Sequence, residues 1–479
     1  MMVLDSGVFP NPQSGEDSTV KYNFVAVQTM AHISPFRALR YDPSKVDIGK
    51  VVTQPYDKIS AEMRERYYQA SPNNLVRIIL GKPDSQDDVA NNPYTRAAAF
   101  FQDWRRHGIF LQDAQPSIYA YAQAFQKPGG GPQLERRGFI ALGKLEDYSA
   151  GVVFRHEQTL AKPKADRLEL LRSTRAHFGQ LFMLYSDPAG EIDSLLTSNA
   201  EPDIAVTDEY KVLHQQWCIS DPALTALVRG KMKEKKLIIA DGHHRYETAL
   251  NYRNERIAAL RNVPRAPQPY SRSDTPVAEP DDTAPHELVM MTFINMDSPG
   301  LVILPTHRVV HGLPLFKPEE LRAKVCEFFS IEQVDPSVDA HRASVILREA
   351  GRMGTALLAV MQDRVYLLDR GKYVPPSVFG GLSLRQQALD VVQLHKCILE
   401  SALGMSEESI RNQEHIRYVR DISDAMDQVR QKQADVAFLM NPVRMEQVRD
   451  IAFAGEVLPQ KSTDFYPKLL SGLTIYALE

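Results

Sequence analysis

The strongest constraint on the fold is an abrupt change of pattern at residues 236–250, which read KLIIADGHHRYETAL. The apolar run at 236–240 is typical of a buried strand. After it, Tyr246 and Ala249 recur at the spacing of a buried helical face. A strand must therefore end, and a helix must begin, within residues 241–245. The chain thus contains a tight strand-to-helix junction that carries an acid, a glycine, two histidines and an arginine.

The remaining pattern mixes helices and strands without the regular β-α-β alternation of a doubly wound sheet. It predicts an α+β fold class, with mixed sheets and packed helices. We expect helices at 59–70, 93–107, 166–175, 207–217, 221–234, 317–329, 339–350, 385–403 and 442–454. We expect strands at 74–80, 117–125, 137–145, 180–186, 236–240, 287–295, 301–305, 355–361 and 364–368, and a loop at 154–165.

Two stretches of biased composition divide the chain. Residues 1–29 and 262–287 are rich in Pro, Ser and acidic residues, and such segments bury too little apolar surface to form a core. We therefore expect a disordered tail at 1–29 and a disordered insertion at 262–287. Between and after them we expect an N-terminal α+β domain at 30–261 and a C-terminal α/β part at 288–479.

Composition narrows the class of protein. A net charge of −4 argues against nucleic acid as a partner. The three cysteines, Cys218, Cys326 and Cys397, are far apart and form no C-x-x-C pair, which fits a reducing cytoplasm. The longest apolar runs are too short to cross a bilayer. We expect a cytoplasmic protein without a membrane partner, and a homo-oligomer is compatible with the sequence.

The junction at 241–245 has the composition of a phosphate site. The first-turn N–H groups of a helix lack partners within the helix, and its dipole favours an anion. Gly242 would let the backbone approach that anion, and Arg245 could grip phosphate oxygens in bidentate fashion. His243 and His244 add donors of adjustable charge. Alternatively, Asp241 is only a helix cap and the histidines face solvent.

Other nucleotide and metal motifs are absent. The nearest approach to a P-loop is GEVLPQKST at 455–463, but Gln460 replaces the second glycine and Pro467 interrupts the helix that should follow. No Rossmann fingerprint is present. Adjacent histidines diverge on a helix, so 241–245 does not predict a zinc site, and we expect no metal held by the protein alone.

A second cluster follows at 156–167, which reads HEQTLAKPKADR. Leu160 stands where a zincin needs its second histidine. What remains is a carboxylate beside a histidine, followed by a hydroxyl and three cations, which suits phosphoryl transfer. The residues are His156, Glu157, Thr159, Lys162, Lys164 and Arg167. The alternative is an exposed charged loop in which Asp166 caps the next helix.

Weaker candidates are scattered along the chain. Each could line the same cleft or could have a purely structural role at a strand end or turn. They are Arg37, Tyr56, Asp57, Asn73, Asn74, Thr306, His307, Arg308, Lys461, Ser462 and Thr463.

Several of these stretches carry a family resemblance. IIADGHHRYETAL, together with FRALRYD, QPYDKIS, RHEQTLAKPKADRLELL, LPTHR and LPQKSTDFYPKLLSGL, strongly resembles a bacterial and archaeal family known as domain of unknown function 1015. More distantly, Asp-Gly-His-His-Arg resembles the phosphate-contacting motif of the ParB/sulfiredoxin fold. That fold includes chromosome-partitioning ParB proteins, sulfiredoxin and an ADP-dependent kinase of free serine.

The resemblance implies a ParB/sulfiredoxin-like core that binds a nucleotide at 241–245, with an additional α/β domain. It implies ATP or ADP with Mg²⁺ as cofactor, and a small hydroxyl compound such as free serine as phosphoryl acceptor. It also implies that Glu157 is the base, with His156 as its neighbour. We expect nearby cations to keep Glu157 ionised.

Two other functions remain open at this point. One is a non-catalytic protein that binds a nucleotide or phosphorylated metabolite. The other is a ParB-like switch that hydrolyses a nucleotide, although we find no basic stretch of the kind that such a clamp carries.

Overall fold

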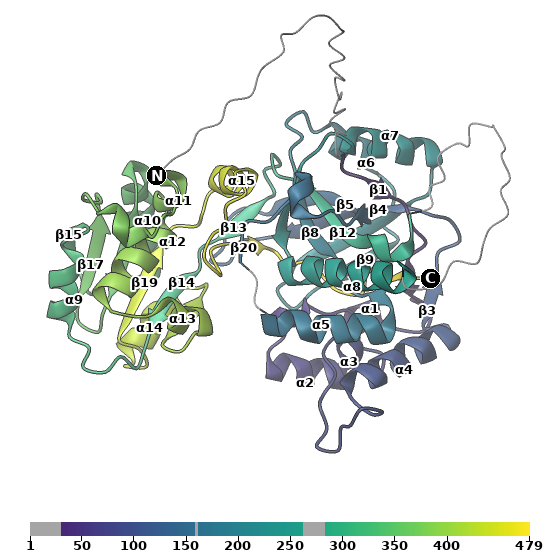
Figure 1. Cartoon of the computed structure of the whole chain (residues 1–479), viewed down its shortest axis with the longest axis horizontal. Coiled ribbons are helices and arrows are strands. Elements are labelled where there is room, and N and C mark those ends of the chain that lie inside the picture. Colours follow the sequence, from purple (N-terminus) through teal and green to yellow (C-terminus); the bar gives the residue numbers. More distant parts are fainter. Residues whose placement is uncertain (1–29, 159–160, 262–282) are drawn as a thin grey trace, which may run out of the picture.

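The computed structural model describes residues 30–158, 161–261 and 283–479. Within these residues the chain forms two bodies, each built on one large sheet. A separate pair of strands, β13 (Val302–Leu304) and β20 (Asp464–Tyr466), lies between the two bodies (Figure 1). The predicted tail at 1–29 and residues 262–282 of the predicted insertion lie outside the described part. No helix in the described part has both the length and the apolar character needed to cross a membrane.

The larger body contains a mixed sheet. Its strand order is β6-β11-β8-β12-β5-β4-β10-β9, and β1 pairs with β5. The pairs β6/β11 and β8/β12 are parallel, and the others are antiparallel. The strands are β1 (Ile33–Ser34), β4 (Ile118–Phe125), β5 (Leu134–Lys144), β6 (Val153–Phe154), β8 (Leu181–Tyr185), β9 (Ile204–Thr207), β10 (Leu213–Ile219), β11 (Leu237–Asp241) and β12 (Leu288–Asn295).

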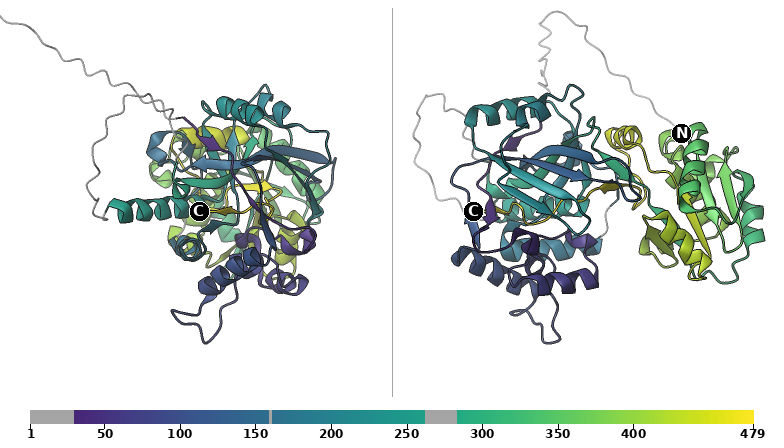
Figure 2. Two further views of the ribbon diagram at one scale, coloured as in Figure 1. Left: turned by 90° about the vertical axis from the view of Figure 1, so that its right-hand side faces the viewer. Right: turned by 180° about the vertical axis from the view of Figure 1, so that it is seen from behind.

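Both faces of this sheet are buried, as its near-continuous apolar strands require. In β8, Leu181 and Met183 face one core, which includes side chains of α6 (Glu191–Leu196), α7 (Pro222–Met232) and α8 (His243–Arg261). Phe182 and Leu184 face the opposite core, which the C-terminal segment at 464–477 helps to form. Figure 2 shows this yellow segment running along the sheet.

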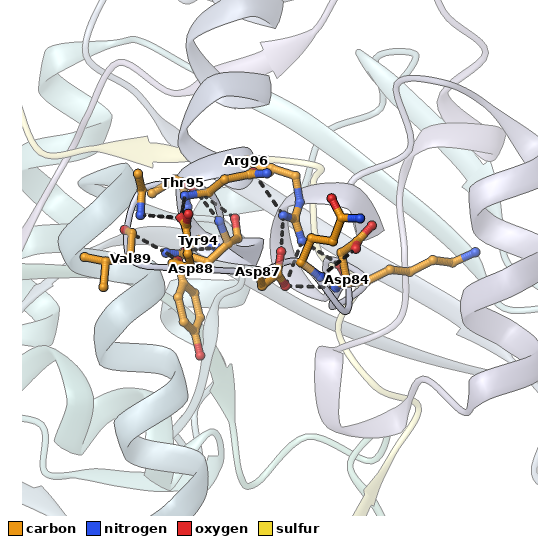
Figure 3. A network of polar contacts seen from close by, with 12 residues as sticks. Asp84, Asp87, Asp88, Val89, Tyr94, Thr95 and Arg96 are labelled. Atoms are coloured by element: carbon orange, nitrogen blue, oxygen red, sulfur yellow. Dashed lines mark hydrogen bonds and ion pairs between the residues drawn. The ribbon is translucent and has the colours of Figure 1, made fainter.

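A helical layer flanks α8. It consists of α2 (Ala61–Ala70), α3 (Val76–Ile79), α4 (Pro93–Arg106) and α5 (Ala161–Thr174), and α5 packs against both α4 and α8. A polar network before α4 fixes its start (Figure 3). There Asn92 accepts hydrogen bonds from the N–H groups of Tyr94 and Thr95, and Arg96 pairs with Asp87. This capping box explains why the helix begins where the sequence predicts.

The smaller body is an antiparallel sheet with helices on both faces. Its strand order is β15-β17-β16-β19-β14-β18. The strands are β14 (His307–Val310), β15 (Ser330–Val334), β16 (Ala356–Val360), β17 (Val365–Asp369), β18 (Ile416–Val419) and β19 (Val436–Met440). The helices are α9 (Pro318–Val325), α10 (Ala340–Ala350), α11 (Leu384–Gln387), α12 (Asp390–Gln393), the π-helix η6 (Leu394–Ala402), α13 (Glu407–Asn412), α14 (Ile422–Arg430) and α15 (Met445–Phe453).

The chain then returns to the larger body. β20 (Asp464–Tyr466) pairs with β13 (Val302–Leu304), and β21 (Tyr476–Ala477) pairs with β7 (Ala176–His177). β12 also belongs to the larger sheet, between β5 and β8. Residues on both sides of position 288 therefore contribute strands to the larger body. Segments from both ends of the predicted C-terminal part complete the larger body.

The α+β class with mixed sheets is confirmed, and some predicted elements are wrong. The strand predicted at 74–80 is wrong, because residues 76–79 form the helix α3, and the side chain of Asn74 accepts a hydrogen bond from the N–H of Val76 just before it. The helix predicted at 207–217 is the end of β9 and most of β10, where His214 and Gln216 are buried and disguise the alternation. The helix predicted at 385–403 is divided among α11, α12 and η6, and α5 begins at 161 instead of 166.

Candidate functional site

A cleft of about 740 Å³ lies between the two bodies and contains both sequence clusters. The larger body contributes the residues around the β11–α8 junction, and the smaller body contributes residues of β18 and its surroundings. The lining residues are Tyr56, Asp57, Lys58, Glu157, Gln158, Ala240, Asp241, Gly242, His243, His244, Arg245, Thr306, His311, Gln413, Ile416, Arg417, Tyr418, Arg420, Lys461, Thr463, Asp464 and Lys468.

Gly242 makes the sharp junction between β11 and α8. Its φ is +95°, a conformation that side chains with a Cβ rarely adopt. A Cβ there would also lie 3.0 Å from Nη2 of Arg245 and 3.0 Å from Cδ2 of Leu181. Glycine is therefore required both for the turn and for the close approach of Arg245. The turn directs the start of α8 into the cleft, as the sequence predicts.

Asp241 is held by two cations. Its Oδ2 accepts a hydrogen bond of 2.9 Å from Arg245, and its Oδ1 accepts one of 3.3 Å from Nζ of Lys468. Burial alone would raise the pKa of Asp241, but Lys468 and Arg245 outweigh it and hold that pKa well below its usual range. Arg245 also donates to the carbonyl of Gln180. Much of the guanidinium is therefore engaged in fixing the junction.

Lys468 lies between two carboxylates. Its side chain is 8% exposed and also pairs with Oδ1 of Asp464 at 3.1 Å. Burial would lower the pKa of Lys468, but Asp241 and Asp464 raise it. For Asp464, burial is likewise outweighed, because Lys468, Lys58 and Arg420 lower its pKa to about 2. Asp464 also accepts a 2.6 Å hydrogen bond from Nε of Arg420, so β20 contributes directly to the site.

His156 lies behind the cleft wall. Its Nδ1 is 2.8 Å from the carbonyl of Ile239, and its Nε2 is 2.8 Å from Oγ1 of Thr463. A carbonyl only accepts, so Nδ1 carries the hydrogen, and Nε2 accepts from the Thr463 hydroxyl. Complete burial lowers the pKa of His156 to about 4. Burial and the neighbouring His156 also hold the pKa of His243 well below its usual value, so both rings are neutral at pH 7.

Glu157 faces the cleft, with its backbone paired to Leu458 in an isolated parallel bridge. Its Oε1 accepts a 3.0 Å hydrogen bond from the backbone N–H of Lys461. Burial is the largest influence on its pKa, which is raised despite this hydrogen bond and the nearby lysines. We expected nearby cations to keep Glu157 ionised, but desolvation has the larger effect on its pKa and favours the neutral acid.

The weaker candidates separate into two groups. Tyr56, Asp57, Thr306, Lys461 and Thr463 line the cleft, whereas the others do not. Outside the cleft, Arg37 bonds the carbonyl of Asp113, and the side chain of Asn74 accepts from the N–H of Val76. Lys164 and Arg167 of the second cluster also lie outside it, where Lys164 pairs with Glu247 and Arg167 pairs with Asp166 and stacks on Tyr56. The carbonyl of Asn73 accepts from Tyr41, the hydroxyl of Ser462 bonds the carbonyl of Pro459, and His307 accepts from the N–H of Met440. Thr159 and the side chain of Lys162 lie outside the described part of the chain.

Arg308 is fully buried beneath the cleft wall of the smaller body. It donates to the carbonyls of Thr306 and Gln460, and its guanidinium lies 4.7 Å from the centre of the Tyr418 ring. Its Nε is 3.4 Å from Nε2 of His395. Burial lowers the pKa of Arg308 to about 10, so it stays charged at pH 7. It supports the site from behind, where the sequence suggested direct contact with substrate.

Several charged residues that line the cleft were not predicted from the sequence. Lys58, His311, Arg417, Arg420, Asp464 and Lys468 also line the cleft. Three of these residues, Lys58, Asp464 and Lys468, belong to the QPYDKIS and LPQKSTDFYPKLLSGL stretches that carry the family resemblance, so a signal was present. No group of three His, Cys, Asp or Glu residues in the described part has the geometry to hold a metal ion.

The sequence matches the family model described as "Protein of unknown function (DUF1015)" over residues 33–392. The chain belongs to the DUF1015 family. The matched segment contains both the His156-Glu157 pair and the 241–245 junction, whereas Lys468 and Asp464 lie beyond it. No curated protein matches the sequence of this DUF1015 member.

Among solved structures, this DUF1015 chain is similar to free serine kinase in complex with AMP. The identity is 13% and the TM-score 0.34, over 70% of this chain and 92% of that one. A variant of free serine kinase in complex with ADP gives 12% identity and a TM-score of 0.34, with the same coverage. C-terminally truncated SbnI from Staphylococcus aureus gives 9% identity and a TM-score of 0.29, over 70% of this chain and 87% of that one.

Proposed function

We propose that this protein transfers a phosphoryl group from a nucleotide to the hydroxyl of a small molecule such as free serine. The observation that carries the proposal is that Glu157 and the start of α8 line one cleft, although they come from separate sequence clusters. A phosphate site and a carboxylate base are the two protein elements that such a transfer requires. Free serine is the first acceptor to test because 241–245 resembles the motif of a serine kinase.

The phosphates of the nucleotide would lie at the start of α8. The first turn of this helix opens at His243 and offers backbone N–H groups and the positive end of the helix dipole. Lys58 and Lys461 line the same cleft, and their Nζ atoms make no hydrogen bond or ion pair with described residues. These two lysines are therefore available to phosphate oxygens, whereas Lys468 and Arg245 are engaged with Asp241.

Glu157 would act as general base. As the acceptor oxygen attacks the terminal phosphorus, Glu157 takes the hydroxyl proton, the new P–O bond forms, and the bond to the leaving phosphate oxygen breaks. The raised pKa of Glu157 suits this role, because a carboxylate in a desolvated site is a stronger base than an exposed one. The N–H of Lys461 fixes the orientation of the carboxylate.

Magnesium would accompany the nucleotide. Mg²⁺ in such sites is held largely by phosphate oxygens and water, with one or two protein carboxylates. Asp57 lines the cleft, and its carboxylate has no hydrogen bond or ion pair with described residues, so it fits as such a ligand. Asp241 and Asp464 fit less well, because Lys468 already bonds both.

The test compares Glu157→Gln with the wild-type protein. We expect Glu157→Gln to lose roughly 10²–10⁴-fold in turnover while binding the nucleotide almost unchanged. Arg245→Ala should instead weaken nucleotide binding first, because it releases Asp241 and loosens the start of α8. Nucleotide consumption is measured with magnesium against free serine and a panel of small alcohols, and affinity is measured by calorimetry. Glu456→Gln, whose carboxylate bonds Ser383 outside the cleft, is the matched control.

The pH dependence gives a second readout. Only ionised Glu157 can accept a proton, and its pKa is raised from 4.5. We therefore expect kcat/KM to rise with pH through an apparent pKa above 4.5, and this limb should be absent in Glu157→Gln. If nucleotide binds but no hydroxyl compound stimulates its consumption, the protein is a ligand-binding protein. Hydrolysis that is independent of any acceptor would indicate a nucleotide-dependent switch.

A further inference from the structure

A second cavity of about 310 Å³ lies in the smaller body beside the cleft, and we name it the side pocket. Its walls come mainly from η5 (Pro376–Phe379), α12, η6, α13 and the loop at 457–460. The walls combine apolar and polar side chains. The apolar lining side chains are Phe379, Leu382, Val392, Ile410, Val457 and Pro459.

The side pocket adjoins the cleft at the Glu157 end. Gln158 and Tyr418 line both cavities, and Gln158 follows Glu157 directly. None of residues 56–58 or 240–245, which surround the start of α8, lines the side pocket. The side pocket therefore adjoins the cleft next to Glu157 and has no lining residue in common with the start of α8.

One polar group gives the side pocket a directional contact. His395 is 7% exposed and lines the pocket. Arginine can only donate, so Nε2 of His395 accepts from Nε of Arg308 and carries no hydrogen. The ring is neutral because burial holds its pKa well below the usual value. Nδ1 must then carry the hydrogen, and it makes no hydrogen bond with described residues, so it offers a neutral donor, beside the side-chain amides of Gln158 and Gln460 that also line the pocket.

The charged residues around the pocket balance one another. Lys396 pairs with Glu400 at 2.9 Å and lies 3.9 Å from Glu407. Arg411 also lines the pocket, so its lining contains two cations and two carboxylates. Such a site has little preference for a charged group. The apolar part of the wall, with the neutral donor of His395 beside it, suits an uncharged group that has an apolar face and presents a hydrogen-bond acceptor.

We propose that the side pocket holds the body of the phosphoryl acceptor, and that this acceptor is a hydroxyl compound with an apolar or aromatic group larger than serine. The inference rests on the proposed function. In an in-line transfer the attacking and leaving oxygens lie on opposite sides of phosphorus. The base contacts the attacking oxygen, so a cavity next to the base receives the acceptor, and the nucleoside lies on the opposite side of phosphorus. Serine alone would leave this pocket unfilled.

The test compares acceptors that differ only by an apolar group. Free serine, 3-phenylserine and N-benzoylserine are assayed for phosphoryl transfer and, separately, for equilibrium binding by calorimetry. We expect at least one aromatic compound to bind roughly 10–100-fold more tightly than serine, from the apolar area that it buries. Its kcat/KM should exceed that of serine by a similar factor.

Substitutions that fill the side pocket test whether the body of the acceptor binds there. Val457 is half-buried and lines the side pocket, so Val457→Phe should remove the advantage of the aromatic compound and leave the kcat/KM for serine within about twofold. Leu382→Phe is a second filling variant. Val374→Phe is the matched control, because Val374 is also half-buried but lies outside the pocket. Melting temperatures show that all variants are folded.

The outcomes separate the two proposals. Transfer to serine and to the aromatic compounds with equal efficiency, unaffected by Val457→Phe, would overturn the side-pocket inference and leave the kinase proposal standing. Aromatic binding that Val457→Phe abolishes, without any phosphoryl transfer, would support the ligand class and overturn the kinase proposal. Weaker nucleotide binding in Val457→Phe would mean that the pocket holds the nucleoside, and the inference would fail.

Discussion

Lys468 controls the charge balance of the cleft. It is buried between Asp241 and Asp464, which otherwise would be two desolvated carboxylates close together. Breaking a buried ion pair by removing one partner leaves an uncompensated charge, and this is more destabilising than losing the pair altogether. Lys468 is therefore the residue whose removal should disturb the site most without touching the nucleotide motif.

We expect Lys468→Met to lower the free energy of unfolding at pH 7 by about 3–5 kcal/mol, measured by urea denaturation. The two carboxylates have lowered pKa values, so their contribution is present above about pH 4 and is lost as the pH falls toward the Asp464 value of about 2. The difference between wild type and variant should accordingly shrink below about pH 4. Lys317→Met, an exposed control, should have no measurable effect. Equal stability of the two variants would show that Lys468 is not a structural counter-ion.

The residues found from the sequence are those that lie in dense local runs. His156-Glu157 and 241–245 each combine several polar side chains within a few positions, so their chemistry is visible without a structure. Arg420 and Lys468 were missed because each pairs with a carboxylate from a distant part of the sequence, and Lys58 was missed because it stands outside the dense polar runs. The side pocket is likewise invisible in the sequence, because the apolar part of its wall has the composition of any core.

The β11–α8 junction is the element on which the candidate site depends, and Gly242 is its tightest point. Gly242→Ala should cost about 1–3 kcal/mol of stability from the strained φ. The new methyl should also displace Arg245 and weaken nucleotide binding. Gly151→Ala is the matched control, because Gly151 has φ +69° but nothing within 4 Å of an added Cβ. Denaturation and calorimetry of both variants separate strain from displacement, and an unchanged affinity in Gly242→Ala would contradict the role of the junction.

Element types were predictable where the apolar pattern was strong and local. The junction itself, the helix at 93–107 and the strand at 117–125 are confirmed nearly at their predicted bounds. The failures come from tertiary context. In β10 the buried His214 hydrogen-bonds Tyr121 and Asp208. A polar residue therefore occupies a buried position at which the alternation of a strand normally places an apolar side chain. In α3 the β-branched residues Val76, Ile78 and Ile79 lie in a short buried helix, whose packing overrides their preference for a strand.

The molecule as a whole should be sensitive to acid. Burial lowers the pKa values of His156 and His307 from 6.5 to about 4. Between these values the unfolded chain binds more protons than the folded one, so stability is lost as the pH falls from about 6.5 to 4. Each histidine should contribute a loss on the order of 1–3 kcal/mol. Urea denaturation at pH 7, 6, 5 and 4.5 measures it, and a free energy of unfolding that stays constant over this range would contradict the buried neutral state.

The return of the chain to the larger body sets an order of events during synthesis. Residues 464–477 complete one face of the large sheet and supply Asp464 and Lys468, but they are translated after the whole smaller sheet at 307–440. A nascent chain that ends before them therefore holds most strands of the large sheet with one apolar face open. Until that segment has been synthesised, this face has no cover from residues 464–477. The cleft that Asp464 and Lys468 line is therefore complete only after these residues have been translated.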